Sequence, residues 1–268
     1  MNYIRDRDPL LAVKNLTVRY NKAPKPIIDG LSFDIAHGET LGVFGSSGCG
    51  KTTIALSIMG LIEQRGGRAE GEILYEGSEL LGLSKQKLRQ LRWREIAMVP
   101  QSSMSALNPV FTIRKTMEET IRAHERKRTI TGSGKSAASK LSKEGGANKA
   151  GVSGDDGGKE TKVNLGSEKM RDRCERLLDL ARLDKPVLTS YPHQLSGGMR
   201  QRVSIALSLA LNPKLLILDE ATTGLDVIVE ADILNTLRQI KEEQGLSLMF
   251  ITHDLRLQNA FCDRRVEL

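Results

Sequence analysis

Aromatic residues are scarce in this sequence, and long apolar runs are absent. Phe, Trp and Tyr make up 4% of the 268 residues, which argues against a protein that binds nucleic acid by stacking bases on aromatic rings. No apolar run approaches the roughly 20 residues that a membrane-spanning helix needs. The first residues, MNYIRDRDPL, lack the apolar stretch of a signal peptide. The composition therefore favours a protein that neither spans a membrane nor is exported.

Cysteine is also sparse, with Cys49, Cys174 and Cys262 lying far apart and outside any CxxC pair. This spacing argues against a disulfide framework and favours a reducing, cytosolic setting. The formal net charge is only +7, which we interpret as ordinary surface composition, so we expect no nucleic-acid partner. The length fits one large α/β domain or two small domains.

One segment differs in composition from the rest of the chain. Residues 129–167 contain nine glycines and six serines among 39 residues, and no aromatic residue. Such a segment cannot bury enough apolar surface to offset the conformational entropy that folding removes. We therefore interpret residues 129–167 as a disordered surface insertion, and we expect limited proteolysis to cut there first.

Outside this insertion, short apolar strands alternate with amphipathic helices. We expect strands at residues 10–20, 31–39, 40–45, 215–220 and 247–252, and helices at residues 52–62 and 227–244. The region from about residue 101 to residue 189 is expected to be mainly helical apart from the insertion. Short apolar strands separated by helices indicate a largely parallel sheet covered by helices, and so an α/β fold.

The segment GSSGCGKT, from Gly45 to Thr52, matches the pattern G-x-x-x-x-G-K-[ST] of a phosphate-binding loop. It lies between an expected strand and an expected helix, which is the context that this pattern requires. Glycines let the backbone approach phosphates closely, and free N–H groups at a helix start bind anions. Lys51 would reach the β- and γ-phosphates, and the Thr52 hydroxyl would ligate Mg²⁺.

The segment LLILDE places two acidic residues at the end of an apolar strand. Asp219 at this position could hold Mg²⁺ through water, and Glu220 could polarise an attacking water. Two such carboxylates could also be a strand end that meets solvent. Together with the phosphate loop, however, they indicate the second half of a nucleotide site.

The segment LSGGMRQRV, from Leu195 to Val203, resembles the LSGGQ signature of the ATPase subunits of ATP-binding-cassette transporters, with Met199 in the place of Gln. With YPHQ at residues 191–194 and MVPQSSMSALNP at residues 98–109, the chain resembles the branch that imports oligopeptides, dipeptides and nickel. The resemblance runs from about residue 10 to residue 261, interrupted by the insertion, and six motifs occur in the family's order.

This resemblance implies roles for further residues. Tyr20 would stack on adenine, Gln101 would approach Mg²⁺ and the attacking water, and His253 would contact the γ-phosphate. Asp226, in the D-loop, would touch a partner subunit. The expected catalytic residues are Lys51, Glu220 and His253, and the expected Mg²⁺ ligands are Thr52, Gln101 and Asp219. The expected nucleotide-binding residues are Tyr20, Gly45, Ser46, Ser47, Gly48, Cys49, Gly50, Lys51, Thr52, Thr53 and Gln101. The signature residues expected to bind the partner's ATP are Leu195, Ser196, Gly197, Gly198 and Met199.

The same resemblance implies the domain organisation. Residues 1–268 are expected to form a single α/β domain of the P-loop NTPase, ABC type, with a mixed sheet core, an antiparallel β part and a helical subdomain at about residues 101–190. Two features depart from the branch. Ala221 follows Glu220 where many members have Pro. Members also continue well beyond the position of Phe261, so we expect a truncated C-terminal end that lacks the strands at that sheet edge.

The function that the resemblance implies is an ATP-hydrolysing subunit of an importer for peptides or nickel, attached peripherally to the cytoplasmic face of the membrane. Its partners would be a second ATPase subunit, identical or not, membrane permease subunits and, indirectly, a substrate-binding protein. One alternative is a soluble ATPase of the same superfamily that acts on nucleic acid or ribosomes. Another is a nucleotide-binding module without turnover. The single cassette, with no coiled-coil heptads, argues against the first, and the complete set of catalytic residues argues against the second.

Overall fold

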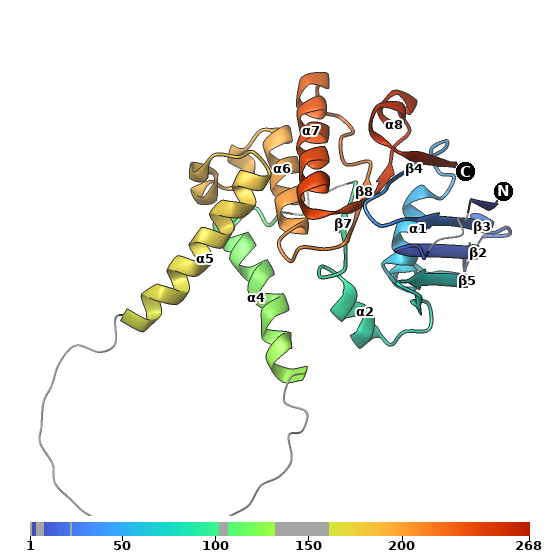
Figure 1. Cartoon of the computed structure of the whole chain (residues 1–268), viewed down its shortest axis with the longest axis horizontal. Helices are drawn as coiled ribbons and strands as arrows, with labels where there is room; N and C mark the ends of the chain where they lie inside the picture. The colour runs from blue at the N-terminus through green and yellow to red at the C-terminus, as the bar shows by residue number, and fades with distance from the viewer. Residues whose placement is uncertain (1, 4–7, 22, 102–106, 132–160) are drawn as a thin grey trace, which may run out of the picture.

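The computed structural model describes residues 2–3, 8–21, 23–101, 107–131 and 161–268. Within these ranges the strands form two five-stranded sheets, one mainly antiparallel and one parallel (Figure 1). The antiparallel sheet has the order β1-β3-β2-β5-β6. Its strands are β1 (Asn2–Tyr3), β2 (Leu11–Tyr20), β3 (Ile28–Ile35), β5 (Gly67–Tyr75) and β6 (Ser78–Glu79).

The parallel sheet has the order β10-β4-β9-β8-β7, and every neighbouring pair in it is parallel. Its strands are β4 (Thr40–Phe44), β7 (Ile96–Val99), β8 (Leu215–Asp219), β9 (Ser247–Ile251) and β10 (Arg264–Glu267). Parallel strands all end at the same edge of a sheet. The ends of β4, β8 and β9 therefore bring three of the sequence motifs to one place.

Largely apolar runs form the inner strands of the parallel sheet because both of its faces are covered. In β8, Leu215 and Ile217 pack in the cluster shared with the antiparallel sheet and α1 (Lys51–Ile58), whereas Leu216 and Leu218 pack against the helices on the other face. Side chains alternate between the two faces of a strand, so a strand covered on both sides must be apolar at every position. The parallel sheet is thus the rigid centre of the molecule.

Besides α1, the helices are α2 (Lys85–Leu91), α4 (Ile113–Thr131), α5 (Thr161–Leu180), α6 (Gly197–Ser208), α7 (Val227–Gln244) and α8 (Leu255–Phe261), with 3₁₀ turns η1 (Ile62–Arg65), η2 (Lys185–Thr189) and η3 (Pro192–Gln194). Helix α2 lies beside α1 (Figure 1), whereas α6, α7 and α8 pack on the other face of the parallel sheet. Parts of α4, α5, η2 and α6 form an apolar cluster of their own. No helix in the described ranges combines the length and apolarity that a bilayer span requires.

The structure corrects the ends of the expected insertion. Residues 129–131 belong to α4 and residues 161–167 belong to α5, so both flanks are helical rather than disordered. Adding residues to an existing helix costs far less than starting a new one, so a flank of poor helix formers can still extend α4 or α5. The remainder, residues 132–160, lies outside the described residues.

Two boundaries in the sheet region were also predicted wrongly. The strand expected at residues 31–39 is β3, which begins at Ile28 and ends at Ile35. The helix expected at residues 52–62 is α1, which ends at Ile58 because Gly60 adopts a left-handed φ of 60° and a 3₁₀ turn follows. Glycine terminated this helix although the apolar pattern continued.

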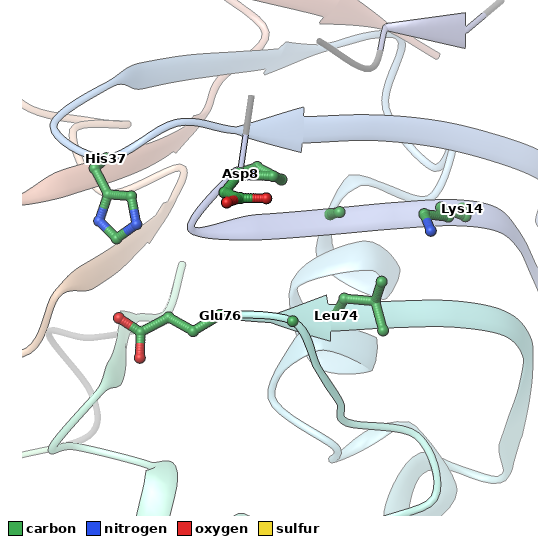
Figure 2. Close-up of a pocket in the computed structure, with 8 residues that line it drawn as sticks. Asp8, Lys14, His37, Leu74 and Glu76 are labelled. Carbon is green, nitrogen blue, oxygen red and sulfur yellow. The ribbon is translucent and has the colours of Figure 1, made fainter. Parts of the chain in front are cut away.

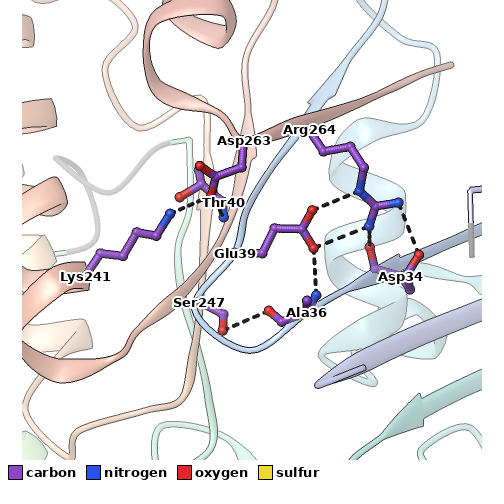
Figure 3. Close-up of polar contacts among 8 residues, drawn as sticks. All are labelled: Asp34, Ala36, Glu39, Thr40, Lys241, Ser247, Asp263 and Arg264. Atoms are coloured by element: carbon purple, nitrogen blue, oxygen red, sulfur yellow. Dashed lines mark hydrogen bonds and ion pairs between the residues drawn. The ribbon is translucent and has the colours of Figure 1, made fainter. Parts of the chain in front are cut away.

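A polar cluster joins the two sheets near the start of β4 (Figure 3). Arg264, on the edge strand β10, pairs with Asp34 at 3.2 Å and with Glu39 at 2.8 Å. Asp263 accepts hydrogen bonds from the Thr40 N–H at 2.8 Å and from Lys241 at 2.6 Å. These contacts tie β10 to β3, β4 and α7, so charged groups as well as strand pairing hold the edge of the parallel sheet.

Candidate nucleotide-binding site

The loop between β4 and α1 has a backbone that only glycine adopts readily. Gly45, Gly48 and Gly50 have φ angles of 156°, 82° and 108°, in the region that L side chains rarely enter. A Cβ atom on Gly45 would also lie 2.6 Å from the Cys49 Sγ, and one on Gly50 would lie 2.5 Å from the Ile28 Cδ1. Backbone conformation therefore favours glycine at all three positions, and close neighbours add to this at Gly45 and Gly50.

Lys51 lies folded across this loop. Its ammonium donates hydrogen bonds to the carbonyl oxygens of Gly45 at 2.8 Å and Ser46 at 2.9 Å, and the residue is only 5% exposed. A buried ammonium needs such partners, because burial without them is costly. The loop thus places a fixed positive charge beside the N-terminus of α1, where an anion is favoured.

Two oxygen ligands meet between α1 and β8. The Thr52 hydroxyl donates to the Asp219 Oδ1 at 3.2 Å, and Asp219 is 1% exposed. Burial, and secondarily the charge of Glu220, raise the pKa of Asp219, whereas Thr52 and Lys51 oppose the shift. Hydroxyl and carboxylate oxygens are ligands that Mg²⁺ binds. The described residues contain no group of three or more His, Cys, Asp or Glu that could hold a metal ion alone. Mg²⁺ would therefore also need phosphate or water oxygens.

Glu220 joins three of the expected motifs. Its carboxylate accepts a hydrogen bond from the Gln101 Nε2 at 2.7 Å, and its Oε1 lies 3.7 Å from the His253 Nδ1. Its N–H donates to the Ile251 carbonyl oxygen, and its φ of 49° is unusual for a residue other than glycine. Such strained residues cluster at functional sites. These contacts fix the orientation of the Glu220 side chain, which is 16% exposed.

A cavity of about 300 Å³ opens over this constellation. The residues that line it are Tyr20, Ile27, Ser47, Gly48, Gly50, Lys51, Thr52, Thr53, Gln101 and Glu220. The Tyr20 hydroxyl lies 3.3 Å from the Thr53 Oγ1. Sequence reasoning missed Ile27, which is 36% exposed, because an Ile directly before a strand belongs to no functional motif. Ser46, Cys49, Asp219 and His253 lie next to these residues but do not line the cavity.

The expected signature residues lie elsewhere. Ser196 caps α6 and accepts a hydrogen bond from the Met199 N–H at 3.2 Å. A Cβ on Gly198 would lie 2.4 Å from the Val229 Cγ1 of α7, and the Val229 N–H donates to Asp226 at 2.9 Å. Residues 195–199 and Asp226 therefore form one packed unit. None of them lines the cavity at this chain's own phosphate loop.

A larger cavity, of about 640 Å³, lies on the antiparallel sheet. Figure 2 shows Asp8, Lys14, His37 and Glu76 spread around it. Charges of both signs face this space, and no residue that the sequence marks as functional lines it. Volume alone therefore does not locate the site, whereas the convergence of motifs at the ends of β4, β8 and β9 does.

The sequence profile of ABC transporters matches residues 28–223. The chain belongs to the ABC transporter family. This cassette is 37% identical over 252 residues to the dipeptide transport ATP-binding protein DppD of Haemophilus influenzae, covering 92% of this chain and 65% of that protein. It is 35% identical over 259 residues to the metal-staphylopine import system ATP-binding protein CntD of Staphylococcus aureus, covering 96% of this chain and 81% of that protein.

Solved cassettes of the family have the same fold. A bacterial ABC transporter cassette, solved as a dimer, matches with a TM-score of 0.72 and 25% identity, covering 96% of this chain and 94% of that chain. The same cassette has been solved in a post-hydrolysis state bound to ADP and phosphate. The fold class and the family that the sequence predicts are thereby confirmed, and the chain is an ABC-type ATPase cassette.

We expect Asp219→Asn to stabilise the nucleotide-free cassette. A carboxylate whose pKa is raised by folding contributes stability only while it is protonated, and this stability is lost as the pH rises through its folded pKa. Asn resembles the protonated form at every pH. The melting temperature at pH 8 should therefore rise, by about 2–4 °C for each kcal/mol gained, and the difference should vanish near pH 4. Thermal unfolding without nucleotide measures this, with the exposed Asp172→Asn as control; an unchanged melting temperature at pH 8 would contradict it.

Proposed function

We propose that this cassette binds ATP with Mg²⁺, hydrolyses it, and powers the import of peptides or metal complexes across a membrane. The observation that carries the proposal is the convergence of Lys51, Thr52, Asp219 and Glu220 at one edge of the parallel sheet, two of them directly hydrogen-bonded. The relatives named for dipeptide and metal-staphylopine import support the class of cargo.

In this proposal the phosphate loop and Lys51 bind the β- and γ-phosphates. Lys51 would exchange its two carbonyl partners for phosphate oxygens, at little cost because its position is already fixed. Thr52 and Asp219, with Gln101 nearby, would hold Mg²⁺, which neutralises phosphate charge when bound. Tyr20, half-buried beside Thr53, would stack on the base.

Glu220 would act as general base. Water attacks the γ-phosphorus while the bond from the γ-phosphorus to the oxygen that bridges the β- and γ-phosphates breaks. Glu220 accepts a proton from that water. Gln101 and His253, within 2.7 Å and 3.7 Å of the carboxylate oxygens, would position Glu220 and the γ-phosphate. The site uses fixed charges rather than large motions of these side chains.

The cassette would work as half of a pair. Ser196 caps α6 by accepting the Met199 N–H, and the signature residues 195–199 do not line the cavity at Lys51. A second cassette, placed head to tail, would supply its own signature to this phosphate loop. Membrane permease subunits would complete the complex on the cytoplasmic face, and the whole chain would form one ATPase domain with helices of residues 101–190 as a subdomain.

Reconstitution tests the proposal. The cassette is assembled in proteoliposomes with the permease and binding protein encoded beside its gene, and uptake of labelled dipeptide, oligopeptide and nickel is measured. We expect ATP-dependent uptake of one cargo that is lost in Lys51→Ala and kept in the exposed Lys87→Ala. Uptake that is unchanged in Lys51→Ala would contradict the proposal, as would a tagged cassette that purifies with ribosomes and not with permease.

A further inference from the structure

A polar seam lies between α8 and β4, the strand that leads into the phosphate loop. Helix α8 packs on this strand (Figure 1). Gly42 allows the close approach, because a Cβ at this position would lie 2.9 Å from the Cys262 Sγ and 3.2 Å from the Gln258 Cδ. The Gln258 side chain therefore rests directly on the backbone of β4. We call this contact, with Thr40 at its edge, the α8–β4 seam.

Gln258 is buried in the seam without a protein partner. The residue is 0% exposed, and within the described residues neither its Nε2 nor its Oε1 makes a hydrogen bond. Burying a polar group without hydrogen bonds is costly, and the buried polar groups of native proteins that lack a protein partner commonly bind an ordered water. The Gln258 amide therefore needs a small polar ligand.

Thr40 supplies a second group of the same kind. It is 1% exposed, and its Oγ1 has no hydrogen-bond partner among the residues that the structure describes. Side chains alternate along a strand, so Thr40 and Gly42 lie on the same face of β4, about 7 Å apart. Two hydrogen bonds with Asp263, at 2.8 Å and 2.9 Å, fix the Thr40 main chain. The seam thus holds polar atoms from both of the elements that meet there.

Water is the ligand that these atoms suit. It donates and accepts at once, as the amide and the hydroxyl do, and a buried water typically makes about three hydrogen bonds. A hard cation suits the seam poorly, because such ions take about six oxygen ligands. The unpartnered side-chain oxygens of the seam are only those of Gln258 and Thr40.

We propose that an internal water bridges Gln258 to Thr40 in the α8–β4 seam, and that this bridge makes Gln258 a positioning residue for His253. His253 lies between the end of β9 and the start of α8, so the seat of α8 on β4 determines where the imidazole lies. Its Nδ1 is 3.7 Å from the Glu220 Oε1, a separation that a small shift of α8 would change. The inference rests on the proposed function only for the contact of His253 with the γ-phosphate.

A thermal double-variant cycle on the full chain tests the water bridge. Thr40→Val and Gln258→Met each leave the other group buried without a partner, so each should lower the melting temperature by at least about 2 °C. The double variant replaces both groups by apolar ones of similar shape and should melt within about 1 °C of the wild type. Gln244→Met makes the same change at an exposed position of α7 and should leave the melting temperature unchanged. A crystal structure of the wild type should show one water within hydrogen-bonding distance of both side chains.

Nucleotide affinity tests the positioning role. Gln258→Met should weaken Mg-ATP binding by at least about fivefold and Mg-ADP binding by less than about twofold, because only ATP offers a γ-phosphate to His253. In a His253→Ala background, Gln258→Met should have no further effect on ATP affinity. A merely structural role would weaken the binding of both nucleotides in both backgrounds.

Three results would overturn the inference. The thermal effects of Thr40→Val and Gln258→Met could add in the double variant, the crystal structure could show no shared water, or the effect of Gln258→Met on ATP affinity could be absent or independent of His253. Failure of the proposed function is distinguishable, because the thermal cycle uses no nucleotide. A chain that follows the expected cycle but does not hydrolyse ATP would contradict the ATPase proposal and leave the water bridge standing. Normal hydrolysis with additive thermal effects would do the reverse.

Discussion

Glu220→Gln is expected to lower ATP turnover by about 10²–10⁴-fold, the usual contribution of a general base. Gln has nearly the same shape and can still interact with Gln101 at the position where Glu220 accepts its 2.7 Å hydrogen bond, but it cannot accept a proton from water. The phosphate loop, Lys51 and the Thr52–Asp219 pair are untouched, so ATP affinity should stay near the wild-type value. Steady-state turnover and equilibrium binding of labelled ATP, measured on the same preparation, separate the two effects.

The same variant reports on pairing. If ATP closes two cassettes and hydrolysis reopens them, Glu220→Gln should accumulate as an ATP-bound pair, which size-exclusion chromatography with light scattering detects as a doubled mass. Glu242→Gln, an exposed change on α7, should turn over ATP normally and stay monomeric. Turnover of Glu220→Gln near the wild-type rate would show that another group accepts the proton.

The parts of the fold that the sequence predicts well are those whose local pattern and buried environment agree. Strand β8 lies within one residue of its expected end, and α7 spans residues 227–244 as expected. Strand β5 carries the exposed charged residues Arg68, Glu70 and Glu72 ahead of a short apolar end, so its assignment depends on pairing with β2, a partner distant in sequence. Strand β10 is four residues long and polar at three of them. Long-range pairing and Arg264, not local pattern, decide that it is a strand.

The candidate nucleotide site also has a part that the local sequence predicts and a part that depends on contacts distant in sequence. The phosphate loop was predictable because its glycines and Lys51 act within a few residues of one another. The contact of Gln101 with Glu220 joins residues 119 apart in sequence, and only the family resemblance placed them together. The 3.7 Å approach of the His253 Nδ1 to the Glu220 Oε1 likewise depends on the parallel pairing of β8 with β9.

The cluster around Arg264 joins the sheets through buried charge (Figure 3). Asp34 and Glu39 have side chains only 1% and 5% exposed, and both face the Arg264 guanidinium. Glu39 also accepts the Ala36 N–H at 2.7 Å, which fixes the turn before β4. Replacing a whole buried ion cluster by apolar groups can be neutral, but removing one partner leaves a buried charge without compensation. The two carboxylates make Arg264 the critical member.

Arg264→Met is therefore expected to lower the free energy of unfolding by about 3–5 kcal/mol. Met nearly fills the volume, so the loss reflects unpaired carboxylates rather than a cavity. Urea unfolding of the two variants and the wild type near neutral pH measures this loss. Arg265→Met is the matched control: this neighbour is exposed and contacts Asn259, so its loss should stay within about 0.5 kcal/mol. If the two variants unfold alike, strand pairing alone holds β10, and the buried charges of Figure 3 do not secure the edge of the sheet that carries the phosphate loop.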